Sequence, residues 1–277
     1  MPPSKSSFVT ACQQLLALGV VVVLQQILTE EQLSNWGWRI PFAIGALGAL
    51  VALWLRRSIA ETEAFATVPD HARRALFKRL WEYRRSAFLV VMLGAGGSLA
   101  FYTFTTYMQK FLVNSAGWTK AEASATSAAA LLGYLLLQPL FGALSDRIGR
   151  RALLITFGVL GVLATVPVLT ALGHATSQRE GFVLILAALT VLSCYTSISG
   201  LVKAELFPAS VRALGVGLPY AVSVSLFGGT AEYVALWFKS TGNEPGFFWY
   251  VTGMIGVSLA TYVLMRDTRK HSRILED

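Results

Sequence analysis

Long apolar segments recur along the whole chain, and their length is the feature that most constrains how it can fold. A helix needs about 20 largely apolar residues to cross a bilayer. Eight segments of the 277-residue chain meet this condition. They cover residues 8–28, 38–55, 87–109, 121–141, 152–172, 181–202, 213–238 and 246–265. The sequence therefore predicts an all-α membrane protein with about eight transmembrane helices.

The composition argues against the main alternatives to a membrane protein. Charged residues make up 14% of the chain, against about 25% in soluble domains, and hydrophobic residues make up 55%. So few charges cannot cover a water-exposed surface. The net charge of +8 could suggest nucleic acid, but the basic residues cluster between the apolar segments, which membrane topology explains better. The cysteines Cys12 and Cys194 lie within apolar segments and are expected to be small buried side chains.

The distribution of Lys and Arg predicts how the chain crosses the membrane. With eight spans both termini lie on one side, and 18 of the 23 basic residues fall on that side. By the positive-inside rule this side is cytoplasmic. The five basic residues on the other side are Arg39, Lys110, Lys120, Arg179 and Lys239. We expect two helices in residues 1–55, a cytoplasmic basic linker at 56–86, six helices in 87–265 and a cytoplasmic tail at 266–277.

The connection after the fourth span carries the most specific local pattern. It consists of Gly142, Asp146, Arg147, Gly149, Arg150 and Arg151. Gly149 permits a tight turn, and Asp146 can accept hydrogen bonds from a neighbouring helix N-terminus. Glu205 and Arg212 lie on the same expected face and could meet these charges. Such contacts can latch helices in one conformational state and release them in another. A role in topology alone would explain the arginines but not the aspartate and the glycines.

This loop resembles the G-x-x-x-D-R-x-G-R-R signature of the major facilitator superfamily. Further strings are similar to the metabolite:proton symporter branch of that superfamily, and they lie at residues 38–42, 61–62, 205–213 and 227–232. Three strings resemble members of the branch that carry 2-oxoglutarate, and they lie at residues 101–110, 195–200 and 231–236. The resemblance covers the last eight of the family's twelve helices. It implies a complete C-terminal six-helix half plus two helices of the N-terminal half.

The resemblance also implies a function. We expect proton-coupled symport of 2-oxoglutarate or a similar carboxylate by alternating access, in the bacterial inner membrane. The expected partners are this small-molecule substrate, the proton and the lipid bilayer, with a missing N-terminal half if the chain is truncated. Two alternatives remain: symport of another metabolite, such as shikimate, citrate or a betaine, and a non-transporting membrane fragment.

Polar residues within the expected spans are candidates for substrate binding or gating, because an intramembrane charge is costly. These candidates are Arg39, Tyr102, Tyr107, Gln109, Lys110 and Tyr195. Arg39 could equally be an interfacial anchor, and Lys110 could mark the membrane edge. Glu232 is a candidate proton site, although a structural acid is favoured. The sequence holds no motif for metal-assisted or nucleophilic catalysis, so we expect no enzyme, no cofactor and no metal.

Overall fold

The computed structural model describes residues 19–20, 23–24, 27–58, 81–208 and 211–265. This described part of the chain is helical and contains no strand. Its elements are α2 (Glu30–Asn35), η1 (Gly37–Arg39), α3 (Ile40–Ser58), α6 (Arg84–Tyr102), η2 (Thr103–Tyr107), α7 (Met108–Asn114), α8 (Lys120–Ile148), α9 (Arg150–Gly173), α10 (Gln178–Thr196), α11 (Ser199–Glu205), α12 (Arg212–Ser223), η3 (Val224–Gly228), α13 (Ala231–Ser240) and α14 (Glu244–Leu264). The predicted all-α class is confirmed.

Seven helical segments of the described residues are long and apolar enough to cross a membrane. They are Gly37–Trp54, Arg84–Asn114, Lys120–Ile148, Arg150–Gly173, Gln178–Glu205, Arg212–Ser240 and Glu244–Leu264. Each corresponds to one predicted span. The predicted span at 8–28 lies almost entirely outside the described residues, as do most of the linker and the tail.

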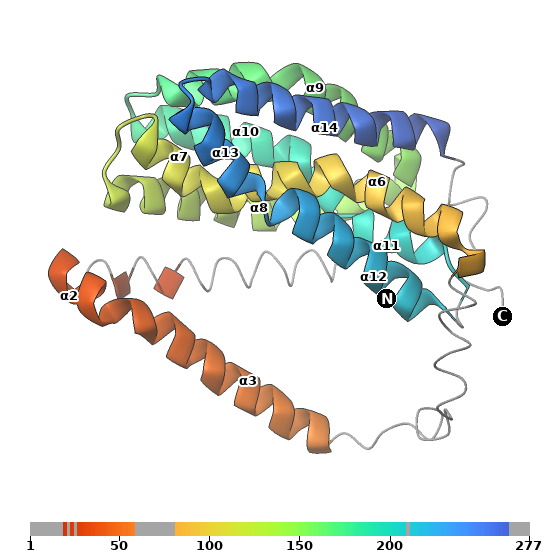
Figure 1. Cartoon of the computed structure of the whole chain (residues 1–277), viewed down its shortest axis with the longest axis horizontal. Coiled ribbons are helices and arrows are strands. Elements are labelled where there is room, and N and C mark those ends of the chain that lie inside the picture. Colours follow the sequence, from red (N-terminus) through yellow and green to blue (C-terminus); the bar gives the residue numbers. More distant parts are fainter. Residues whose placement is uncertain (1–18, 21–22, 25–26, 59–80, 209–210, 266–277) are drawn as a thin grey trace.

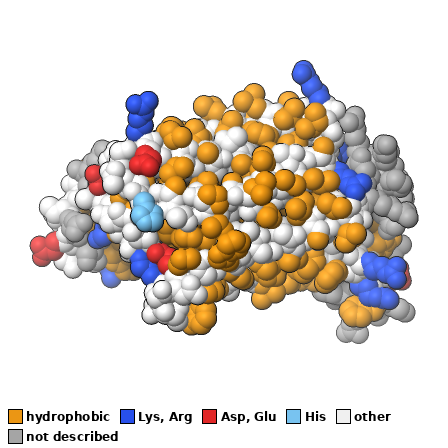
Figure 2. All heavy atoms as spheres, turned by 90° about the horizontal axis from the view of Figure 1, so that it is seen from above, with side chains coloured by type: hydrophobic (Ala, Val, Ile, Leu, Met, Phe, Trp, Pro, Cys, Tyr) orange, Lys and Arg blue, Asp and Glu red, His pale blue; other side chains and the backbone are white. Residues whose placement is uncertain are grey.

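The last six of these segments pack into one bundle (Figure 1). Within it, α14 lies against α6 and α9, while α10 lies against α8 and α9, and α12 packs on α6. The helix α3 stands apart from the bundle in the same view, and only 6% of Gly37–Trp54 is buried. Figure 2 shows hydrophobic side chains over the middle of one face of the molecule, with charged side chains toward its two ends. This distribution suits a bilayer as the surrounding solvent.

Two spans are interrupted by π-helical turns. The segment η2 joins α6 to α7, and η3 lies between α12 and α13. A π-helical turn leaves backbone groups without their regular helical partners, and such turns occur frequently at functional sites. At the start of η2 both the hydroxyl of Thr103, at 2.8 Å, and its backbone N–H donate to the carbonyl of Leu99.

A serine from α14 holds α6 and α14 in close contact. The backbone N–H of Gly96 donates to the hydroxyl of Ser258 at 2.9 Å, and this hydroxyl donates to the carbonyl of Met92 at 2.8 Å. Tyr262 adds a third link, because its hydroxyl donates to the carbonyl of Leu93 at 2.9 Å. Small residues and interhelical hydrogen bonds are the means by which helices associate in lipid, where the hydrophobic effect gives no drive.

Gly96→Ala should destabilise the protein, because the added Cβ would lie 2.3 Å from the carbonyl oxygen of Met254 and 2.5 Å from the Cα of Ile255. Both are backbone atoms and cannot rotate away. We expect a loss of about 1–3 kcal/mol, the usual range for an overpacked core. Thermal unfolding in detergent measures it. Gly253→Ala on the exposed face of α14 is the control, since its Cβ would meet no atom within 4 Å. Equal melting temperatures for the two variants would contradict this packing.

Candidate functional site

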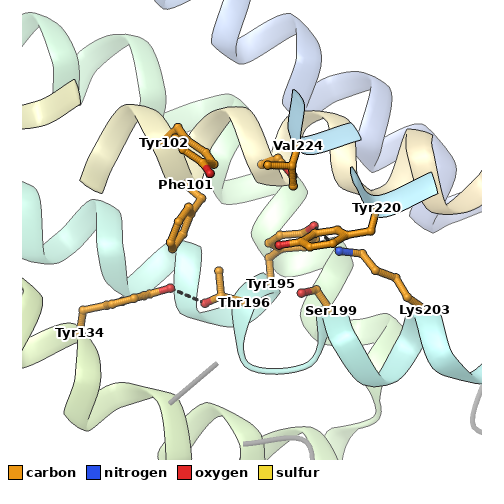
Figure 3. A pocket seen from close by; sticks show the side chains of 10 residues that line it. Phe101, Tyr102, Tyr134, Tyr195, Thr196, Ser199, Lys203, Tyr220 and Val224 are labelled. Atoms are coloured by element: carbon orange, nitrogen blue, oxygen red, sulfur yellow. Dashed lines mark hydrogen bonds between the residues drawn. The ribbon is translucent and has the colours of Figure 1, made fainter. Parts of the chain in front are cut away.

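A cavity of about 140 Å³ lies inside the bundle, between α6, α8, α10, α11 and α12 (Figure 3). Hydroxyl groups, aromatic rings and one amine form its walls. The lining residues are Ser98, Phe101, Tyr102, Tyr134, Tyr195, Thr196, Ser199, Lys203, Tyr220 and Val224. Helix-lined cavities of this kind, mostly apolar with a few polar groups, are typical of small-molecule sites.

A break between α10 and α11 gives the cavity one of its polar walls. The helix α10 ends at Thr196 and α11 begins at Ser199, so hydroxyl residues flank the break on both sides. Hydroxyl side chains compete with the backbone for hydrogen bonds, and here Thr196 donates to the carbonyl of Leu192 at 3.2 Å. The break brings Tyr195 and Thr196 from one helix and Ser199 and Lys203 from the next to the same cavity.

Lys203 supplies the charge of the site. Its side chain is only 2% exposed, and its Nζ donates to the hydroxyl of Tyr195 at 3.3 Å. The same Nζ lies 4.1 Å from the centroid of the Tyr220 ring and 5.6 Å from that of Tyr195. Among the described residues, no carboxylate forms a salt bridge with Lys203. A buried ammonium is costly without an anion, and one ring face and one hydroxyl offset only part of that cost.

The opposite wall is fixed by a hydrogen-bond network between α8 and α10. The hydroxyl of Tyr134 donates to that of Thr196 at 2.7 Å, as the dashed line in Figure 3 marks. The buried Gln138 joins the network, because its Nε2 donates to Thr196 at 3.2 Å and to Ser193 at 3.3 Å. A satisfied buried network of this kind holds its side chains in one arrangement.

The structure brings two of the six candidate binding or gating residues to the cavity. Tyr102 and Tyr195 line it. Tyr107 instead packs in the core, with its ring centroid 5.6 Å from that of Phe247. Gln109 is half-buried, and its Nε2 has no hydrogen-bond partner among the described residues. Arg39 lies in η1 beside the ring of Trp38, at 5.3 Å from its centroid.

The remaining candidate, Lys110, forms an ion pair with Glu232, the candidate proton site. The pair joins α7 to α13 and is partly exposed, at 55% for Lys110 and 36% for Glu232. A second group lies near it, where Lys239 donates to the hydroxyl of Ser115 at 3.0 Å and lies 3.9 Å from Glu244. These contacts tie α7, α13 and α14 together at one end of the bundle.

The loop with the most specific pattern lies at the junction of α8 and α9. Gly149 has φ 94°, a left-handed conformation that only glycine adopts readily, and it ends α8. Arg150 then forms an ion pair with Glu205 of α11, which is 3% exposed. Arg151 donates through Nε to the carbonyl of Tyr262 at 3.3 Å, at the end of α14. Residues of the predicted latch therefore connect α9 to both α11 and α14.

The other members of the predicted latch lie around this junction. Gly142 is buried and its carbonyl accepts a hydrogen bond from Ser145 at 2.7 Å, while Asp146 and Arg147 are exposed at the end of α8. The Nε of Arg212 donates to the carbonyl of Phe207 at 3.3 Å.

Sequence reasoning missed Lys203 as a site residue because it ended the sixth span at residue 202 and counted Lys203 with the cytoplasmic loop. The helical segment in fact continues to Glu205. It also missed Tyr134 and Tyr220. An available signal was the position of Lys203, directly adjoining an apolar span rich in hydroxyl residues.

Comparison with known proteins agrees with this architecture. Residues 66–272 match the model of the family described as "Sugar (and other) transporter". The chain belongs to this family, which places it in the major facilitator superfamily. This confirms the resemblance found in the sequence.

Three relatives show what the chain is similar to. It is 53% identical to the alpha-ketoglutarate permease of Escherichia coli strain K12 over 261 residues, which cover 94% of the chain and 60% of the permease. It is 29% identical to the citrate-proton symporter of Klebsiella pneumoniae, over 96% of the chain and 62% of that protein. Its identity to the proline/betaine transporter of Escherichia coli strain K12 is 27%, over 91% and 53%. The chain thus spans between about half and two thirds of the length of these transporters.

Arg150→Ala should destabilise the protein by about 3 kcal/mol, because it leaves the buried carboxylate of Glu205 without its partner. The double variant Arg150→Ala, Glu205→Ala should cost less than the sum of the two single variants, since no charge is then left unpaired. Thermal unfolding in detergent measures all three.

Arg179→Ala at the exposed start of α10 is the matched control, with an expected change within about 0.5 kcal/mol. Strict additivity of the two single variants would show that the ion pair does not stabilise this junction.

Proposed function

We propose that the chain forms part of a secondary active transporter that carries 2-oxoglutarate or a similar small carboxylate with protons by alternating access. The observation that carries this proposal is the buried ammonium of Lys203 in a hydroxyl-lined cavity, with no carboxylate of the described residues paired to it. The similarity to an alpha-ketoglutarate permease and to a citrate-proton symporter supports the same class of substrate.

An anionic substrate would supply a negative partner for the ammonium of Lys203. A carboxylate beside Nζ of Lys203 would form a charge-assisted hydrogen bond, which is stronger than the present bond to the hydroxyl of Tyr195. The hydroxyl of Ser199 lines the same cavity and can donate to a further oxygen, whereas the hydroxyl of Tyr134 already donates to Thr196. The attraction between the substrate carboxylate and the buried ammonium would contribute to binding, because it acts in a medium of low dielectric constant.

The charged junction of α8 and α9 supports the alternating-access part of the proposal. The ion pair of Arg150 with Glu205 and the bonds of Arg151 to the end of α14 join three helices at one end of the bundle. Contacts of this kind can close one side of a transporter and must break when that side opens. We propose that these residues bias the equilibrium between the inward-facing and outward-facing states.

The proposed activity belongs to the twelve-helix architecture, in which the cavity faces a second half. In this division, residues 1–55 form the last two helices of the N-terminal half. Residues 56–86 form a cytoplasmic linker, residues 87–265 the six-helix half and residues 266–277 a cytoplasmic tail. The ion pair with Lys110 supports a structural role for Glu232.

The tests below also distinguish two alternative functions. Symport of a different metabolite would use the same cavity, and the similarity to proline/betaine transporters favours this alternative. A cationic wall at Lys203 argues against a substrate that carries its own ammonium group. The second alternative is a membrane fragment that does not transport.

Transport can be measured with the chain in proteoliposomes. An acidic outside should drive accumulation of labelled 2-oxoglutarate, and a protonophore should abolish it, because a symporter couples the two gradients. A chimera that places the first part of the Escherichia coli alpha-ketoglutarate permease before this chain is the comparison. Accumulation only in the chimera would indicate a non-transporting fragment. If the rate of uptake is the same with and without a pH gradient in both proteins, symport with protons is contradicted.

Lys203→Met should raise the Kd for 2-oxoglutarate at least about tenfold, since a hydrogen bond to a charged group contributes about 1.5–3 kcal/mol. Lys203→Arg retains the positive charge and should bind more tightly than Lys203→Met. Isothermal titration calorimetry on the purified protein measures both. Lys120→Met, at the exposed start of α8, is the control and should bind as the unchanged protein does. An unchanged Kd in Lys203→Met would remove Lys203 from the substrate site.

A further inference from the structure

The ammonium of Lys203 lies against the ring of Tyr220 and beside the hydroxyl of Tyr195. Its Nζ is 4.1 Å from the centroid of Tyr220, within the range of cation–π attraction, and it lies at the hydroxyl edge of Tyr195, 5.6 Å from that ring's centroid and 3.3 Å from its oxygen. Figure 3 shows the lysine side chain reaching from α11 to the place where the two tyrosines meet. The two rings come from different helices, α10 and α12, so the tertiary fold creates this cation site.

The rest of the cavity has the composition that recognises organic cations. Aromatic side chains form half of its lining: Phe101, Tyr102, Tyr134, Tyr195 and Tyr220. A quaternary ammonium has no N–H to donate, so proteins bind it through ring faces. The hydroxyls of Ser98 and Ser199 lie in the same cavity and can donate to a carboxylate on the same molecule.

We propose that Lys203 occupies a subsite for quaternary ammonium groups and thereby determines specificity. With Lys203 in place, its ammonium fills the site between Tyr195 and Tyr220 and repels a second cation. Without the side chain, the same rings bind the trimethylammonium group of a zwitterion such as glycine betaine. The claim about specificity rests on the proposed function, because it takes this cavity as the substrate site, whereas the claim about the rings does not.

Space for such a ligand follows from the geometry. The side chain of Lys203 adjoins a cavity of about 140 Å³, and truncation at Cβ would join the volume of the lysine to it. The lysine is 2% exposed, so protein atoms surround the vacated place except where it joins the cavity. Cation–π attraction is stronger in such a desolvated position than at an exposed one.

The experiment titrates Lys203→Ala with glycine betaine and with 3,3-dimethylbutanoate by calorimetry on the purified chain. The second compound has the same shape, with a carbon in place of the charged nitrogen, and so isolates the effect of the cation. Lys203→Ala should bind glycine betaine at least about fivefold more tightly than 3,3-dimethylbutanoate. The unchanged protein should bind glycine betaine at least about tenfold more weakly than Lys203→Ala does, because its own ammonium excludes the ligand.

Variants of Tyr220 test the role of the ring. Adding Tyr220→Leu to Lys203→Ala should abolish the preference for the cation, whereas adding Tyr220→Phe keeps the ring face and should preserve it. Lys203→Ser is titrated in the same way if Lys203→Ala is not monodisperse. Equal affinity for the two compounds, or a preference that survives Tyr220→Leu, would overturn the proposal.

Titration with 2-oxoglutarate separates the two proposals. If the unchanged protein binds 2-oxoglutarate but Lys203→Ala shows no preference for glycine betaine, the ammonium subsite is wrong and the carboxylate function stands. If the unchanged protein does not bind 2-oxoglutarate but Lys203→Ala binds glycine betaine with the expected preference, the subsite stands and the carboxylate function is wrong.

Discussion

Every backbone amide and carbonyl inside a bilayer must find its hydrogen bond within the protein, and this constraint shapes the whole fold. Long helices meet it, and the described spans depart from the regular α-helix at η2, at η3 and at the break between α10 and α11. Hydroxyl side chains cover carbonyls there, as Thr103 and Thr196 do. All three irregular segments border the same cavity, since Tyr102, Val224 and Ser199 lie at their ends. Each irregular segment of the described spans therefore has one end at the candidate site.

Buried charged side chains are under the same constraint, since they too need partners within the protein. Glu205 has a cationic partner in Arg150, whereas Lys203 has the ring face of Tyr220 and the hydroxyl of Tyr195. Both residues lie on α11, a helix of seven residues, so the cavity and the charged junction share one short element. A change in the position of α11 would alter both the cavity and the ion pair. Under the proposed function, a substrate bound at Lys203 would therefore act on the ion pair through this one helix.

The sequence was sufficient for the architecture because length and hydrophobicity alone decide which segments can cross a membrane. It also indicated Tyr102, Tyr195 and the residues around Gly149, where hydroxyl-rich and charged strings resemble a known family. It could not indicate Tyr134 or Tyr220, because an isolated tyrosine in an apolar helix is equally suited to the core, as Tyr107 proves to be. Lys203 was misplaced because a span boundary is uncertain by a few residues, and only tertiary packing shows that this lysine is buried.

A cryo-electron microscopy structure of the protein with 2-oxoglutarate tests the central claim most directly, namely that Lys203 is the cation that receives the substrate. The account predicts ligand density in the cavity bounded by Tyr102, Tyr134 and Tyr220, with a carboxylate oxygen about 3 Å from Nζ of Lys203. Ligand density elsewhere, with Nζ still bonded only to the hydroxyl of Tyr195, would contradict it.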